Sequence, residues 1–155
     1  EFRRVLFRSE FGEDRLATPE GKPKFMSEET ARVAVDFLLA NSSGRRAVHL
    51  TFFGGETLMN FKVVQSTIAY ARERAHEAGK YIDFSLTTNA TLLTPPVIEF
   101  LTENLVGVTI SIDGPKEMND QLRVFSNGQG SYEVIAPKVR ELLARHTTQI
   151  GRAHV

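Results

Sequence analysis

The sequence contains no cysteine, and this absence limits its chemistry more than any other feature of its composition. A chain without thiols forms no disulfide and binds no metal or iron centre through thiolate ligands. Tryptophan is also absent. No apolar run approaches the ~18 residues that a membrane span needs, and the N-terminus has no signal-peptide pattern. We therefore expect a cytoplasmic protein with no membrane partner.

The charge of the chain is balanced, with 19 basic and 19 acidic residues among 155. Two terminal stretches, residues 1–9 and 150–155, do not fit the pattern of the rest, and both match translated sequencing-adapter DNA. We expect them to be artefacts and residues 10–149 to be the native part, cut from a longer gene. Without the four arginines and one glutamate of these stretches, 15 basic and 18 acidic residues remain. This mildly acidic balance argues against a nucleic-acid partner.

Apolar periodicity predicts strands and helices that alternate along the chain. Strands are expected near residues 46–53, 81–88 and 107–112. Helices are expected to begin after Ser27, Asn60, Thr94 and Ser131, with Gly79 and Gly107 ending the second and third. The polar, glycine-bearing segment 114–130 is interpreted as a loop. Because each connection between strands is long enough for a helix, the pattern predicts a parallel sheet of right-handed βαβ units.

Each predicted strand has one aliphatic face and one face of polar side chains. A doubly wound sheet, covered by helices on both sides, would be apolar on both faces. The pattern instead favours an α/β barrel or partial barrel with a hydrated interior, where polar groups at the strand ends converge at the C-terminal mouth. Those strand-end groups are Glu56, Asn89, Ser111 and Asp113.

The strand near residue 50 ends in Gly54, Gly55 and Glu56, and a helix follows. Paired glycines leave backbone groups accessible at the edge of a sheet, which is where α/β proteins bind ligands. On its own, however, this pattern is also typical of a simple tight turn.

Three stretches taken together are more specific: FFGGETLM, LTTNATLLT and VTISIDGPKEMNDQLRVFSNGQGSYEVI. In this order and spacing they resemble the radical S-adenosylmethionine (SAM) enzymes of the peptide-maturing type that carry a C-terminal SPASM domain. The likeness is strongest to thioether-forming maturases, such as those of quinohemoprotein amine dehydrogenase, and covers roughly residues 11–146. It implies an α/β fold that is a parallel-stranded fragment of a partial (β/α)6 TIM-like barrel.

The resemblance also implies roles for individual residues. Gly54, Gly55 and Glu56 match the GGE motif that holds the methionyl amino group of SAM, and bare carbonyls with a carboxylate suit such a cation. Asn89 matches the asparagine of a TNG motif that lines the cofactor and substrate cavity. Ala90 stands where that motif has glycine, which leaves the turn geometry open.

The third stretch supplies the other candidate residues. Ser111 and Arg123 match residues implied to bind the methionyl carboxylate and the nearby ribose, and a guanidinium suits a carboxylate. Asp113 is implied to line the same cavity. Two alternatives stay open: Arg123 pairs with Asp120 in a loop, or Asp113 forms an Asx turn before Gly114.

The resemblance implies SAM and a [4Fe-4S] cluster as cofactors, a peptide or protein substrate, and a reductant such as flavodoxin or ferredoxin. It assigns no catalytic residue within this stretch. The family's CxxxCxxC loop would lie just upstream of Glu10, because residues 11–13 followed by residues 26–30 resemble the stretch that comes just after this loop. Because the chain has no cysteine, we expect it to be inactive as it stands and at best a weak SAM binder.

Two other functions are compatible with parts of the pattern. A non-enzymatic α/β nucleotide-binding module would use Gly54 and Gly55 for a phosphate, although the GxGxxG spacing is missing. An aldolase-like or hydrolytic barrel would use Glu56 and Asp113 as acid and base, although no lysine or metal-ligand set stands at the strand ends.

Overall fold

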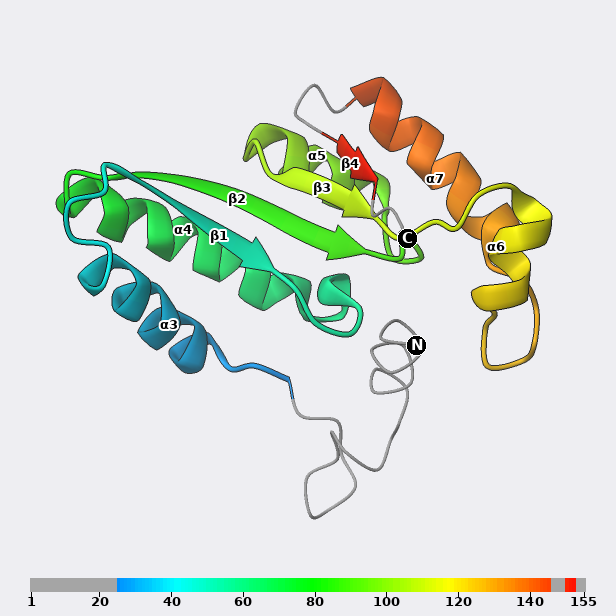
Figure 1. Ribbon diagram of the computed structural model, residues 1–155, viewed down its shortest axis with the longest axis horizontal. Helices are drawn as coiled ribbons and strands as arrows, with labels where there is room; N and C mark the ends of the chain where they lie inside the picture. The colour runs from blue at the N-terminus through cyan, green and yellow to red at the C-terminus, as the bar shows by residue number, and fades with distance from the viewer. Residues whose placement is uncertain (1–24, 146–149, 153–155) are drawn as a thin grey trace, which may run out of the picture. The chain divides into compact units, whose positions relative to one another are not determined.

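The computed structural model describes residues 25–145 and 150–152 (Figure 1). These residues form two compact units that divide between Asp83 and Phe84. The elements in chain order are α3 (Glu28–Ala40), β1 (Ala47–Phe52), the short 3-10 helix η1 (Thr57–Asn60), α4 (Phe61–Glu77), β2 (Tyr81–Thr88), α5 (Pro95–Glu103), β3 (Gly107–Ile110), α6 (Lys116–Leu122), α7 (Tyr132–Arg145) and β4 (Ile150–Arg152).

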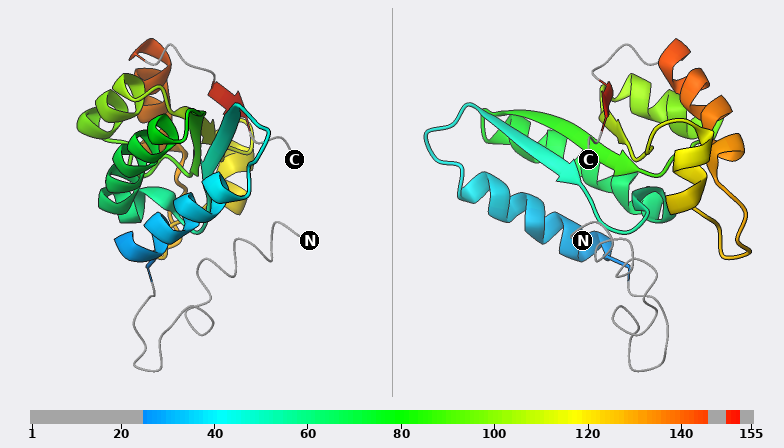
Figure 2. Two further views of the ribbon diagram at one scale, coloured as in Figure 1. Left: turned by 90° about the vertical axis from the view of Figure 1, so that its left-hand side faces the viewer. Right: turned by 45° about the vertical axis from the view of Figure 1, so that its right-hand side comes forward.

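The first unit contains α3, β1, η1, α4 and the beginning of β2. Ser27 caps α3, since its side chain accepts a hydrogen bond from the Thr30 N–H at 3.1 Å. The start of β2 lies beside β1, where the Tyr81 N–H donates to the Arg46 carbonyl at 2.8 Å. The helices α3 and α4 lie side by side (Figure 2) and bury an apolar stripe that includes Val35 and Ile68.

A polar cluster joins the outer faces of α3 and α4. The Asp36 carboxylate accepts hydrogen bonds from the Arg74 Nε–H at 3.0 Å and from the Tyr70 hydroxyl at 2.9 Å. The Arg32 guanidinium lies 5.2 Å from the centre of the Tyr70 ring. These bonds to Arg74 first, and to Tyr70 second, hold the pKa of Asp36 below its ordinary value.

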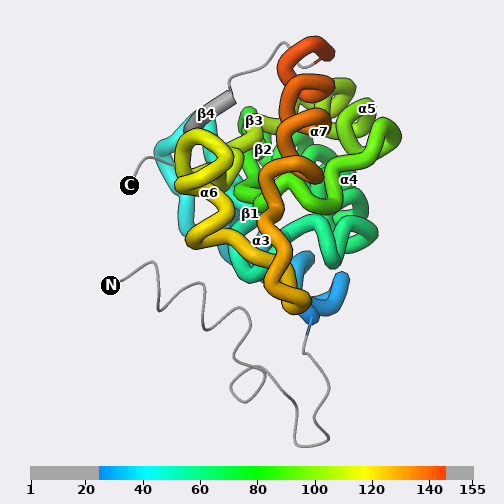
Figure 3. The backbone as a smooth tube through the Cα atoms, turned by 90° about the vertical axis from the view of Figure 1, so that its right-hand side faces the viewer, coloured from blue at the N-terminus to red at the C-terminus, as the bar shows by residue number. Residues whose placement is uncertain are grey.

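The second unit contains the rest of β2, together with β3, β4, α5, α6 and α7. Strands β2 and β3 are parallel, with Leu86 paired to Val108 and Thr88 paired to Ile110. Strand β4 is parallel to β3 on its other side. Helix α7 packs against both α5 and α6 (Figure 3), and the buried core includes Leu86, Ile98 and Leu142.

The structure confirms an α/β fold with parallel strands, and the three predicted strands lie within two residues of their expected ends. Burial alternates along each of them, as the two-faced pattern predicts. A fourth strand, β4, lies in the stretch that we expected to be adapter-derived. Its origin in adapter DNA stays a prediction.

Three local predictions are wrong. Segment 114–130 is not a loop throughout, because Lys116–Leu122 forms α6. Helix α5 ends through Leu105, which adopts a positive φ of 50°, and not through Gly107, which begins β3. Asn60 precedes α4 but makes no side-chain cap; its amide donates to the Met26 carbonyl at 2.9 Å instead.

Candidate functional site

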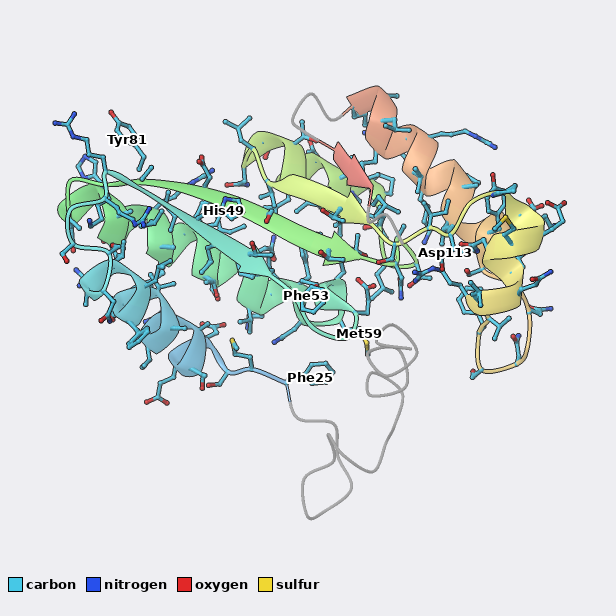
Figure 4. The ribbon with its side chains drawn as sticks, viewed as in Figure 1. Phe25, His49, Phe53, Met59, Tyr81 and Asp113 are labelled. Carbon is cyan, nitrogen blue, oxygen red and sulfur yellow. The ribbon has the colours of Figure 1, made fainter. Side chains whose placement is uncertain are left out.

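The glycine turn after β1 belongs to the first unit. Gly54 has a φ of +146°, a conformation that residues with a side chain rarely adopt, and open space surrounds the position of an added Cβ. The half-buried Glu56 caps η1, because its carboxylate accepts the Leu58 N–H at 3.0 Å. Figure 4 labels Phe53 and Met59, which bracket this turn in sequence and are 67% and 61% exposed. The turn is therefore structured and remains accessible.

Asn89 and Ser111 lie at one edge of the sheet in the second unit. They follow Thr88 and Ile110, the last paired residues of β2 and β3, and the Ser111 N–H donates to the Thr88 carbonyl at 2.9 Å. The carboxyl ends of two neighbouring parallel strands thus bring both residues together, as the sequence predicts.

Side-chain hydrogen bonds hold the turn after β2 in one conformation. The Asn89 side-chain carbonyl accepts the Thr91 N–H at 2.9 Å and the Thr91 hydroxyl at 2.7 Å, which makes an Asx turn. Ala90 is buried and adopts a φ of +66°, the left-handed conformation that glycine takes readily. The alanine therefore keeps the backbone conformation that a glycine would favour, at some conformational cost. Lys138 of α7 also donates to the Thr91 carbonyl.

Arg123 pairs with Asp113. Its Nε–H donates to Asp113 Oδ2 at 2.8 Å, and the two side chains are only 12% and 11% exposed. Figure 4 marks Asp113 between the end of β3 and α6. Of the two alternatives left open by the sequence, a pairing of Arg123 with Asp120 is wrong. A guanidinium held this way is oriented by a charge-assisted hydrogen bond.

Asp120 has a different partner, the start of α7. Its Oδ1 accepts the Tyr132 N–H at 2.8 Å, which satisfies a backbone donor of the first helical turn. The carboxyl group packs closely on Gly130, where an added Cβ would lie 2.1 Å from Asp120 Cγ. Asp120 and Gly130 thus form a close contact that joins α6 to α7.

Asn119 lies beside Asp113 and Asp120, and the sequence pattern did not predict it as a site residue. Its side chain is fully buried and bonds to Asp113, Asp120 and Ser131. A helical interpretation of residues 116–122 would have found it, because Asn119 and Arg123 are four residues apart and share one face of a helix.

The predicted site residues fall in both units. Asn89, Ser111, Asp113 and Arg123 belong to the second, whereas the glycine turn and Glu56 belong to the first. Their convergence at one rim stays a prediction. A separate surface cleft of about 470 Å³ lies in the first unit between α3 and β1, and Phe37, Ser42 and His49 are among its lining residues. It contains none of the predicted site residues.

Two absences among the described residues bear on other classes of protein. Within residues 25–145 and 150–152, no group of three or more His, Asp or Glu side chains is placed to hold a metal ion. In the same part of the chain, no helix has the length and apolar character that crossing a membrane requires.

Comparison with known proteins identifies the family. Residues 7–149 match the Radical SAM superfamily, and the chain belongs to this superfamily. A serine-type anaerobic sulfatase-maturating enzyme of Bacteroides thetaiotaomicron is 35% identical over 132 residues, which are 82% of this chain and 30% of that enzyme. An uncharacterized protein of Methanocaldococcus jannaschii is 35% identical over 108 residues, 70% of this chain and 36% of that protein.

Solved structures show the same fold. Native anSMEcpe with bound AdoMet and Cp18Cys peptide superposes with a TM-score of 0.75 at 24% identity, over 86% of this chain and 36% of that one. Native anSMEcpe with bound AdoMet alone gives 0.74 at 24% identity, over 87% and 37%. The chain thus spans about a third of the length of the relatives it matches. The resemblance to peptide-maturing radical SAM enzymes is confirmed.

The residues present suit one cofactor of this family and not the other. The superfamily's cofactors are SAM and an iron–sulfur cluster. The chain offers no thiolate to a cluster, since it has no cysteine. By contrast, carbonyl and carboxylate acceptors at Gly54–Glu56 suit an ammonium group, and the Ser111 hydroxyl and Arg123 guanidinium suit a carboxylate.

Proposed function

We propose that this chain is part of a radical SAM enzyme that modifies a peptide or protein, and that it supplies much of the SAM site. The match of residues 7–149 to the superfamily is the observation that carries this proposal. The two rival functions, a phosphate-binding module and an acid–base barrel, have no such support.

In the proposed site, each end of the methionyl group of SAM has its own set of partners. Gly54, Gly55 and Glu56 bind the amino group through acceptor oxygens. Ser111 and Arg123 bind the carboxylate and the nearby ribose. The ion pair at 2.8 Å supports this role, because Asp113 holds the guanidinium in one orientation before SAM arrives.

Asn89 and Asp113 line the cavity next to the cofactor in this proposal, within a partial (β/α)6 barrel. The position of Asn89 beside Ser111 at one sheet edge supports this part. Electrons would come from a reductant such as flavodoxin or ferredoxin, delivered to a cluster held by cysteines outside this chain.

The bond formed in the substrate is a finer question. We propose a thioether cross-link on the basis of the sequence resemblance. The relatives are named for other reactions: two are sulfatase-maturating enzymes, and a 27% identical one from Paramaledivibacter caminithermalis is a cyclopropyl synthase. The maturases among these relatives share the modification of a peptide or protein, so the proposal in its general form is peptide or protein modification, and the thioether bond is its more specific form.

A SAM titration of the isotope-labelled full chain, followed by NMR, tests the binding site. We expect weak binding, with backbone shifts at Gly54, Gly55, Asn89 and Ser111. Arg123→Lys keeps the charge but loses the planar fork, so it should weaken binding about tenfold. Arg140→Lys, at an exposed residue of α7, is the matched control and should leave the affinity unchanged.

Shifts confined to the cleft around Phe37 and His49 would contradict the proposed site, as would equal affinities for Arg123→Lys and Arg140→Lys. An independent test is the nucleotide sequence upstream of Glu10, where we expect codons for CxxxCxxC.

A further inference from the structure

Asn119 is the most deeply buried polar side chain near the candidate site. It is 0% exposed, although an asparagine carries two donor hydrogens and a carbonyl oxygen that all need partners. A buried amide of this kind is retained only when its hydrogen bonds offset the cost of removing it from water.

Three segments supply those partners. Asn119 Nδ2 donates to Ser131 Oγ and to Asp120 Oδ1, both at 3.2 Å, and Oδ1 accepts the Asp113 N–H at 3.4 Å. These neighbours determine the orientation of the amide, because an ionised carboxylate only accepts and a backbone N–H only donates. Asn119 thus connects the segment after β3, helix α6 and the start of α7.

The backbone of Arg123 is held at both of its polar groups. The Arg123 N–H donates to the main-chain carbonyl of Asn119 at 2.8 Å, which closes the last turn of α6, and the Ser131 N–H donates to the Arg123 carbonyl at 3.0 Å. Arg123 is therefore held on both sides by Asn119 and by Ser131, which is itself a partner of Asn119. The other half of the ion pair, Asp113, is held through its own N–H.

We infer that Asn119 is a positioning residue: it holds Asp113 and Arg123 in register so that the guanidinium has one orientation at the sheet edge. That Arg123, paired with Asp113, binds SAM rests on the proposed function. The positioning of the two side chains by Asn119 does not depend on SAM. Asp120 and Gly130 support it, since their close contact secures the start of α7 that carries Ser131.

The Arg123 Nε–H resonance in NMR reports directly on this register. We assign it by its loss in Arg123→Lys and follow two quantities in the full chain without SAM, its chemical shift and its exchange with solvent. Exchange is referred to the backbone N–H of the buried Leu86, so that opening of the whole unit is accounted for.

Asn119→Leu keeps the size of the side chain and removes its hydrogen bonds. We expect the Arg123 Nε–H to shift and to exchange about tenfold faster relative to Leu86, as for the loss of one charge-assisted hydrogen bond. Asn127→Leu is the matched control. The Asn127 side chain bonds to Gln129, within the same connection, and this variant should leave the Arg123 signal unchanged.

An unchanged Arg123 signal in folded Asn119→Leu would overturn the inference. If that variant does not fold, Ser131→Ala decides, since it removes one partner of Asn119; a smaller change in the same direction supports the inference, and no change overturns it. SAM titration of the same variants separates the two proposals. A changed Arg123 signal in a chain that never binds SAM would leave the positioning role intact and would contradict the SAM site proposed for this chain.

Discussion

At the scale of single residues, two threonines of the first unit differ in one hydrogen bond. Thr67 is buried in α4, and its hydroxyl donates to the Val63 carbonyl at 2.6 Å. Thr57 begins η1, and its Oγ1 is buried with no hydrogen-bond partner among the described residues. A buried hydroxyl without a partner loses its hydration and gains nothing in return.

Replacing each threonine with valine should therefore have opposite effects on stability. Thr57→Val removes the unsatisfied hydroxyl and should raise the free energy of unfolding by about 1 kcal/mol. Thr67→Val removes a made hydrogen bond and should lower it by about 0.5 to 1 kcal/mol. Urea denaturation of the two variants measures both, and a destabilised Thr57→Val would contradict the structure at this position.

At the scale of elements, α4 and α5 end in the same way with different residues. In α4, the Gly79 N–H bonds to the His76 carbonyl and the Lys80 N–H to the Ala75 carbonyl. In α5, Leu105 and Val106 make the equivalent bonds to Thr102 and Leu101. Both ends are Schellman motifs, with Gly79 at a φ of +63° and Leu105 at +50°. Only the second carries a side chain in the left-handed conformation.

Leu105→Gly should therefore stabilise the chain. Relief of the left-handed strain, about 1 to 2 kcal/mol, exceeds the extra backbone entropy of glycine and leaves a gain of about 0.5 to 1 kcal/mol. Gly79→Leu is the converse variant and should lose a similar amount through φ alone, because open space surrounds the added Cβ. Thermal or urea unfolding of both variants checks the signs, and two changes of equal sign would refute this account.

The cluster that joins α3 to α4 makes their packing dependent on pH. The pKa of Asp36 in the folded chain lies below its ordinary 3.8, first because of Arg74 and second because of Tyr70. The stabilisation is therefore complete above the unfolded-state pKa and is lost as the pH falls through the folded-state pKa.

Asp36→Asn should be less stable than the parent at neutral pH, and the difference should shrink in acid below about 3.8. Urea unfolding at neutral and acidic pH measures it, with Asp83→Asn, an exposed aspartate of the same unit, as the control. A difference that persists unchanged in acid would show that the carboxylate is not the stabilising group. Added salt should also reduce it, since the ion pair is about half exposed.

At the scale of the whole molecule, the lack of cysteine decides what the purified chain can do. After reconstitution with iron and sulfide, we expect no absorbance band of an iron–sulfur cluster and no cleavage of SAM. The sulfatase-maturating relative of Bacteroides thetaiotaomicron, treated in parallel, is the control for reconstitution. A cluster band in this chain would refute the expectation that it is inactive as it stands.

Much of the fold could be predicted from the sequence because the strands and long helices have strong apolar periods. Helix α6 could not. It has seven residues, too few for a stable isolated helix, and its buried Asn119 bonds to Ser131 and Asp113, which lie outside the helix. Leu105 was missed for a related reason, since a glycine two residues later carried the expected signal for a helix end.

The sequence by itself determined the family, because the three strand-end motifs and their order along the chain are local features that can be recognised without coordinates. It also determined that no thiolate chemistry is available. The tertiary structure decided the partner of Arg123: Asp113 and not Asp120. Ion pairs between residues ten positions apart depend on the path of the chain between them, and along that path the buried Asn119 bonds to Asp113, Asp120 and Ser131.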